Sequence, residues 1–139
     1  MNKKREGSSL VPYKRVGGEI FFFLQKRDKN AVRAPGLFGI FGGGFEEGED
    51  AQMALVREIK EELNYVPKTA IYFSRYEFAM GIFHVFIEEV GGGFETEVKV
   101  DEGEYGKFLT LSDIETMPNV SPSTRAIVNQ LSEFLTQTS

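Results

Sequence analysis

The sequence predicts an α/β fold in which helices pack against a mixed β-sheet. Its 139 residues suffice for one domain with one core and are too few for two ordinary domains. Segments rich in β-branched and aromatic residues alternate with two segments of helical periodicity, in the order strands, helix, strands, helix. This order is typical of a single layered α/β domain. We therefore expect one domain over residues 1–139, with residues 1–7 as a flexible N-terminus.

Two strands are predicted first, over residues 8–15 and 19–27. Gly17 and Gly18 separate them, and this dipeptide suits the positive φ angles of a tight hairpin turn. The polar residues 28–35, which close with a proline, are expected to form a loop. The chain is thus expected to begin with a β-hairpin.

A helix is predicted over residues 50–63. A short apolar segment at 37–41 precedes it, and the glycines at 42–44 are expected to form the turn that leads into it. Asp50 is the expected N-cap, where a carboxylate accepts a hydrogen bond from the first turn. Asn64 is the expected end of the helix, because asparagine tolerates the left-handed conformation.

The second half of the chain predicts two further strands, over residues 70–78 and 81–90. Residues 95–105 are rich in glutamate and are expected to be a solvated loop, followed by a short strand at 106–111. A final helix is expected to begin at Ser121, since a proline follows this capping residue. Its apolar residues recur at helical spacing: Ile127, Val128, Leu131, Phe134 and Leu135.

Composition excludes several classes of function. The net charge of −5 and the pI near 5.0 argue against electrostatic binding of nucleic acid over a broad surface. The absence of cysteine excludes disulfides, thiolate metal sites and cysteine nucleophiles. The longest apolar run, residues 20–24, is far too short to span a bilayer. The N-terminus also lacks a hydrophobic stretch of signal-peptide length. We therefore expect a cytoplasmic protein with no membrane partner.

The first predicted helix has an acidic face beside its apolar face. Glu58, Glu61 and Glu62 fall within about one third of the helix circumference. Their like charges repel, and the helix dipole disfavours negative charge in the last turns, although Arg57 and Lys60 offset part of this. Carboxylate oxygens are the ligands that Mg²⁺ and Mn²⁺ prefer, so a divalent cation would turn the repulsion into coordination. The apolar face is expected to comprise Leu55, Val56, Ile59 and Leu63.

A spaced pattern over residues 43–65 resembles the signature G-x5-E-x7-R-E-U-x-E-E-x-G-U of the Nudix hydrolase family. Two of its nine defined positions differ: Asn64 stands for the usual glycine and Tyr65 for the usual aliphatic residue. Phe41 also differs, since many relatives have proline just before the paired glycines. The seven positions that match are Gly43, Glu49, Arg57, Glu58, Ile59, Glu61 and Glu62.

The resemblance implies a fold and an activity. The fold would be the Nudix α/β/α sandwich, with a mixed β-sheet between helices. The activity would be hydrolysis of a nucleoside diphosphate linked to another group, such as a nucleoside triphosphate or a nucleotide sugar, by attack of water on phosphorus. This nucleotide pyrophosphohydrolase reaction would depend on Mg²⁺, for which Mn²⁺ can substitute, because cations must neutralise the phosphate oxygens.

The resemblance also implies the metal ligands. Glu58 and Glu62 are the expected direct ligands, and Glu61 is expected to bind the metal directly or through water. The carbonyl of Gly43 is a further expected ligand. Glu102, in the acidic segment, is expected to be an extra ligand or the general base, with Glu104 as the competing choice.

Other residues are expected to hold the metal ligands in place or to bind the substrate. Arg57 and Glu49 are expected to pair and to hold the glycine-rich segment against the helix. Arg27 is expected to contact a substrate phosphate, with Lys26 or Arg33 as alternatives. His84, the only histidine, is interpreted as a packed sheet residue and not as a base.

Three alternatives are weighed against the hydrolase. A Nudix-fold module that binds a nucleotide without cleaving it is the second candidate, although the repulsive glutamate cluster favours an enzyme. An isoprenoid diphosphate isomerase normally relies on cysteine, which this chain lacks. Messenger RNA decapping does not suit the acidic composition.

The absence of proline between Pro67 and Pro118 weakly disfavours ADP-ribose as substrate. A homodimer formed through the aromatic N-terminal hairpin is a further expectation.

Overall fold

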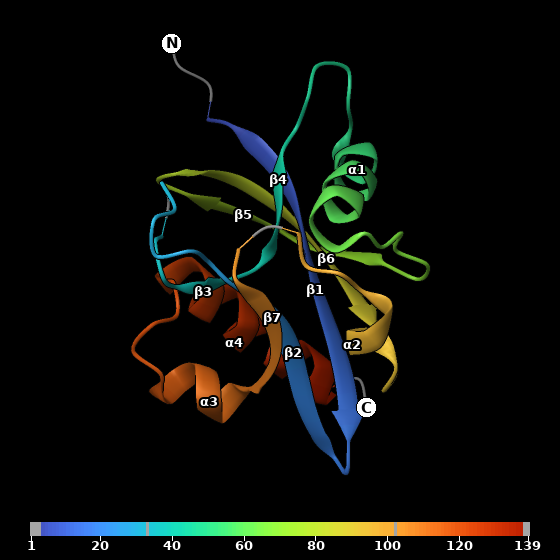
Figure 1. The fold of residues 1–139 in the computed structure, drawn as a ribbon, viewed down its shortest axis with the longest axis vertical. Helices are drawn as coiled ribbons and strands as arrows, with labels where there is room; N and C mark the ends of the chain where they lie inside the picture. Colours follow the sequence, from blue (N-terminus) through green and yellow to red (C-terminus); the bar gives the residue numbers. More distant parts are fainter. Residues whose placement is uncertain (1–3, 33, 102, 138–139) are drawn as a thin grey trace.

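A seven-stranded mixed sheet organises the protein, with α1 and α4 on different sides of it (Figure 1). The structure, a computed structural model, describes residues 4–32, 34–101 and 103–137. The strands run in the order β3-β2-β1-β6-β5, with β4 also paired to β1 and β7 also paired to β2. Their bounds are β1 Glu6–Val16, β2 Glu19–Lys26, β3 Phe38–Gly39, β4 Phe41–Gly44, β5 Ile71–Phe78, β6 Gly81–Glu89 and β7 Tyr105–Thr110. The helices are α1 Ala51–Leu63, α2 Phe94–Glu97, α3 Leu111–Thr116 and α4 Pro122–Gln137.

The predicted hairpin is confirmed. Val16 pairs with Glu19, and the two glycines between them have φ angles of 59° and 83°, the range that a tight turn of this kind requires. The predicted bounds differ slightly, because β1 begins at Glu6 and β2 ends at Lys26. Beyond the hairpin, β1 continues antiparallel to β4 and runs parallel to β6 along its other edge.

The prediction of a turn at residues 42–44 is wrong. These glycines form β4 and pair with the beginning of β1, where Ser9 lies opposite Gly42. A Cβ atom on Gly42 would lie 2.7 Å from the Cα of Ser9 and would also collide with the carbonyl oxygen of Ser8. At Gly42 the two backbones therefore pack closer than a side chain allows, and this close approach explains the glycine at this position of β4.

Alternate residues of the strands build one core on each face of the sheet. On one face, Leu10 and Phe41 pack with Leu55 and Ile59 of α1. On the other face, Val11 and its neighbours pack with the apolar residues of α4. Phe134 is an exception among the predicted apolar residues of α4, since it is 40% exposed.

The caps predicted for α1 are confirmed. The carboxylate of Asp50 accepts a hydrogen bond from the N–H of Met53 at 2.8 Å, and Asn64 adopts the left-handed conformation with φ 53°. Leu55, Ile59 and Leu63 are buried as expected, whereas Val56 is 38% exposed and does not belong to the core face. Glu62 takes its place among the buried residues of the helix.

Two short helices were not predicted. The segment expected to be an acidic loop overlaps α2, whose first residue, Phe94, is buried against the α1 core. Helix α3 begins with a capping box in which Thr110 and Asp113 exchange side-chain to backbone hydrogen bonds. Across the residues described, no helix has both the length and the apolar character needed to cross a membrane.

Candidate active site at the glycine strand

Two carboxylates of α1 lie on the glycines of β4. Glu62 is only 3% exposed, and its Oε1 accepts a hydrogen bond from the N–H of Gly42 at 2.7 Å. The carboxylate of Glu58 lies over Gly43, since a Cβ built on this glycine would be 2.6 Å from Glu58 Oε1. The glycines of β4 therefore let both carboxylates lie close to the backbone of the strand.

Arg57 links the helix to the segment that follows β4. Its guanidinium makes a two-pronged pair with Glu49, with Nε 2.7 Å from Oε2 and Nη2 2.9 Å from Oε1. It also donates to Glu58 Oε1 at 2.8 Å and to the carbonyl oxygen of Gly44 at 2.9 Å. The predicted pairing of Arg57 with Glu49 is thus present. Arg57 orients Glu58 directly, which is a role the sequence did not reveal.

The Arg57 pair controls the ionisation of Glu49. The hydrogen bond from Arg57 is the main cause that lowers the pKa of Glu49 from 4.5 to about 2, with a smaller contribution from the N–H of Glu46. The pKa of Arg57 is raised in turn, chiefly by Glu49. Because a lowered carboxyl pKa favours the folded state above pH 4.5, this stabilisation should fall progressively as the pH decreases from 4.5 toward 2.

An Arg57→Gln substitution tests this coupling. We expect the pKa of Glu49 to rise toward 4.5, because glutamine carries no charge to stabilise the carboxylate. The measurement is an NMR titration of the Glu49 carboxyl carbon in the native and variant proteins. Lys60→Gln, which removes an exposed cation from the same helix, is the control and should leave the titration unchanged. A pKa that stays near 2 in Arg57→Gln would contradict the assignment.

Glu61 lies on the exposed side of the acidic face, where it contacts the same nitrogen of Arg57 as Glu58 does. Its side chain is 55% exposed, and its carboxylate is 3.5 Å from Nη1 of Arg57. In the part of the chain that the structure describes, no three acidic or histidine side chains are arranged to hold a metal ion. The acidic face therefore divides into an inner pair, Glu58 and Glu62, and an outer carboxylate. The ligand roles of all three stay predictions.

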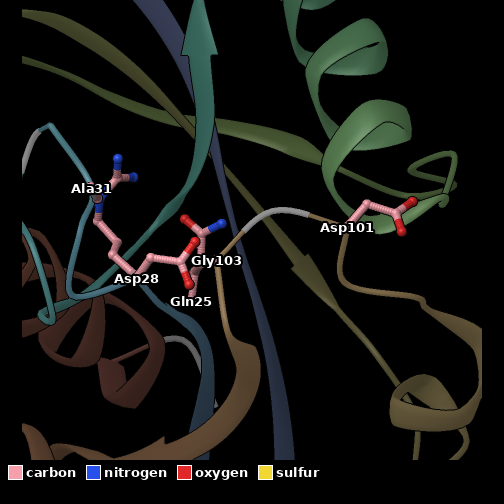
Figure 2. Close-up of a pocket in the computed structure, with 6 residues that line it drawn as sticks. Gln25, Asp28, Ala31, Asp101 and Gly103 are labelled. Carbon is pink, nitrogen blue, oxygen red and sulfur yellow. The ribbon is translucent and has the colours of Figure 1, made fainter.

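A polar pocket of about 330 Å³ adjoins the end of α1 (Figure 2). In Figure 2, Gln25 and Asp28 lie on one side of it and Asp101 lies beside the helix. The backbone N–H of Asp101 donates to the carbonyl oxygen of Glu62 at 2.8 Å, which ties the pocket wall to the helix. The residues that line the pocket are Gln25, Arg27, Asp28, Ala31, Asp101 and Gly103.

The pocket contains one predicted site residue and several that sequence reasoning missed. Arg27, the predicted phosphate contact, lines it, just beyond the end of β2. Gln25 was missed, although a glutamine among the apolar residues of β2 is a signal, and it is only 2% exposed. Asp28 and Asp101 lie in segments interpreted as loops, where the pattern of the sequence does not distinguish a pocket wall from solvent.

Of the two candidates for the base or extra ligand, only Glu104 lies among the residues that the structure describes. Glu102 and the alternative phosphate contact Arg33 lie outside the described residues. Glu104 is described, and its Oε2 lies 3.4 Å from Nζ of Lys26, so these two side chains form an ion pair. Neither of them is among the residues that line the pocket. The choice of Glu102 as base stays a prediction.

His84 takes part in a contact network with nearby side chains on β1, β5 and the segment after β4. Its Nδ1 lies 2.8 Å from the hydroxyl oxygen of Tyr72, and its Nε2 lies 2.7 Å from Oε2 of Glu6. The imidazole also stacks on Phe45, with ring centres 5.6 Å apart. Both nitrogens are thus engaged by neighbouring side chains, in agreement with its interpretation as a packed sheet residue.

The fold and this site together define a class: an α/β sandwich in which a helix brings two glutamates and an arginine to a glycine strand. The sequence profile of the NUDIX domain matches residues 4–131, most of the chain. The chain therefore belongs to the Nudix hydrolase family, whose members act on nucleoside diphosphates linked to other groups. Among curated proteins, no sequence matches it.

Solved structures share the fold. The Nudix domain of Shewanella oneidensis NrtR, complexed with ADP ribose, is 17% identical with a TM-score of 0.78 and covers 97% of this chain and 90% of its own. The MutT Nudix hydrolase of Burkholderia pseudomallei is 22% identical, with a TM-score of 0.73 and coverages of 93% and 98%. A C. elegans Ap4A hydrolase complex is 21% identical, with a TM-score of 0.69 and coverages of 96% and 98%. At these identities the likeness establishes the fold alone.

Proposed function

We propose that this protein is a metal-dependent nucleotide pyrophosphohydrolase, acting on a nucleoside triphosphate or a nucleotide sugar. Membership of the Nudix family supports hydrolysis of a nucleoside diphosphate linked to another group. The single observation that carries the proposal is the placement of Glu58 and Glu62 on the glycines of β4. We also propose a cytoplasmic location and one domain over residues 1–139. The flexible N-terminus expected over residues 1–7 does not include Glu6 and Gly7, because both belong to β1.

The oxygen donors that α1 and β4 bring together fit a hard divalent cation. Carboxylate and carbonyl oxygens are the donors that Mg²⁺ and Mn²⁺ favour, and Glu58, Glu62 and the Gly43 carbonyl supply them. The close approach of the Glu58 carboxylate to Gly43 leaves no room for a side chain there. When bound, the cation would neutralise phosphate oxygens and activate a water. Glu61 and Glu102 are proposed as further ligands, Glu61 directly or through water.

The remaining residues would position the reactants. Arg57, held by Glu49, fixes the side chain of Glu58 and keeps the segment after β4 against the helix. Arg27, in the pocket wall, would bind a phosphate through its guanidinium. Glu102 would accept a proton from the attacking water, with Glu104 as the competing base. The pocket beside α1 would hold the substrate during this attack.

Substrate turnover by native protein and variants tests the proposal. Phosphate or pyrophosphate release is measured with nucleoside triphosphates, nucleotide sugars, Ap4A and ADP-ribose, in Mg²⁺ or Mn²⁺. We expect metal-dependent turnover by the native protein and roughly 10²- to 10³-fold lower kcat in Glu58→Gln and Glu62→Gln, because each loses a charge that stabilises the transition state. In Glu62→Gln the new amide oxygen can still accept from the Gly42 N–H, so folding should persist.

Glu133→Gln, on the exposed side of α4, is the matched control and should retain native activity. Unchanged kcat in both Glu58→Gln and Glu62→Gln would contradict the proposed ligands. A native protein that binds these nucleotides without metal and cleaves none of them would instead support the non-catalytic binding module.

A further inference from the structure

Strand β5 ends the sheet with an open edge. Within the residues described, β5 pairs with β6 along one side only. The outer side therefore presents backbone N–H and C=O groups that an added strand can pair with. At eight residues, β5 is long enough for such pairing, and it contains no proline to block it.

The charges on β5 are arranged symmetrically about Tyr76. Arg75 lies opposite His84 of β6 and Glu77 lies opposite Ile82, so both side chains are on the same sheet face. They are 51% and 46% exposed, and Nη2 of Arg75 is 3.3 Å from Oε1 of Glu77. One positive and one negative charge therefore flank the same residue at the edge.

This arrangement is self-complementary in one antiparallel register. If two copies of β5 pair with Tyr76 at the two-fold axis, Arg75 of each copy lies opposite Glu77 of the other. Shifting the axis to residue 75 would place arginine opposite arginine, and shifting it to residue 77 would place glutamate opposite glutamate. The charges thus discourage these two registers and favour pairing about Tyr76.

Exposed apolar side chains gather near the same strand. Ile71 and Tyr72 are 56% and 49% exposed at its beginning, and Met80 is 53% exposed just after its end. An antiparallel partner would bring the turn that contains Met80 in one copy toward the beginning of β5 in the other. On the opposite sheet face, Phe134 of α4 is 40% exposed and contacts Phe73, with ring centres 5.3 Å apart.

The N-terminal hairpin offers less apolar surface to a partner. Its aromatic residues Phe22 and Phe23 are 0% and 2% exposed, because they belong to the two cores. Phe21 is half-buried, so Phe22 and Phe23 do not supply exposed surface for the homodimer expected at this hairpin, and that expectation stays a prediction. The large exposed apolar side chain of the hairpin is Val16.

We propose that two copies of this chain associate through antiparallel pairing of their β5 strands about Tyr76, forming one continuous sheet. Backbone hydrogen bonds would supply the contact, the two Arg75–Glu77 pairs would set its register, and the apolar residues at both ends would bury surface. This assembly is independent of the catalytic proposal, since none of these residues belongs to the candidate active site.

Charge reversal on β5 tests the association, measured as a dissociation constant by analytical ultracentrifugation. We expect the native protein to sediment at twice the chain mass of 15.7 kDa at micromolar concentration. Arg75→Glu and Glu77→Arg should each raise the dissociation constant about tenfold or more, because two attractive cross-strand pairs become repulsive. The double swap Arg75→Glu with Glu77→Arg restores opposite charges and should return the constant to within about threefold of native.

Arg75→Glu is the cleaner single variant, because Glu77 also contacts Lys4 at 3.2 Å within the chain. Glu19→Arg makes the same reversal at the exposed end of the hairpin and should leave the dissociation constant unchanged. Circular dichroism checks that every variant stays folded. A monomeric native protein, an unaffected single variant, or a double swap without rescue would overturn the proposal, and a dimer broken only by Glu19→Arg would place the interface on the hairpin.

Discussion

Gly43→Ala is expected to lower the proposed hydrolase activity by on the order of 10²-fold while the protein stays folded. An added Cβ would lie 2.6 Å from Glu58 Oε1, which is closer than real side chains approach. The atom it meets is the end of a flexible side chain, so the carboxylate would move and the backbone would not have to. Displacement of Glu58 would remove it from both the Gly43 backbone and Arg57.

The measurement compares kcat and the thermal unfolding midpoint of Gly43→Ala with those of Gly44→Ala. The neighbouring glycine is a matched control, because the nearest atoms to its added Cβ would be 3.8 Å away, an ordinary contact. Gly44→Ala should therefore keep near-native activity and stability. Equal losses of activity in the two variants would show that strand flexibility matters, and not the position of Glu58.

Gly42→Ala is expected to destabilise the fold by about 3 kcal/mol, because it combines backbone strain with overpacking. The φ angle of Gly42 is 149°, a conformation that residues with a Cβ rarely adopt. Its added Cβ would meet the backbone of Ser8 and would lie 2.7 Å from the Cα of Ser9. Backbone atoms cannot rotate away as the Glu58 carboxylate can, so the pairing of β4 with β1 must open.

Thermal unfolding followed by circular dichroism checks this prediction. A loss of this size should lower the midpoint by roughly 10 °C. Three adjacent glycines thus have three different expected outcomes: lost stability at 42, lost activity at 43 and little change at 44. A midpoint for Gly42→Ala within about 2 °C of native would contradict the close backbone approach between β4 and β1.

Local patterns in the sequence determined much of the architecture. The Gly17-Gly18 hairpin, the N-cap Asp50 and the left-handed Asn64 depend on the conformational preferences of a few adjacent residues, and all three are confirmed. The spaced motif at 43–65 was sufficient to place the chain in the Nudix family, and the profile match agrees. The pairing of Arg57 with Glu49 also followed from the motif.

The tertiary structure decided what depends on residues distant in the chain. Gly42–Gly44 form a strand and not a turn, because they pair with β1, far earlier in the chain. The three glutamates share a helix face in sequence, yet only Glu58 and Glu62 contact the glycines, because only one flank of α1 faces β4. The pocket walls come from β2, from the segment that follows it and from the segment before β7, which is joined to α1 through the Asp101 contact. Periodicity specifies the face on which a residue lies, whereas the segment that covers that face is determined only when the sheet assembles.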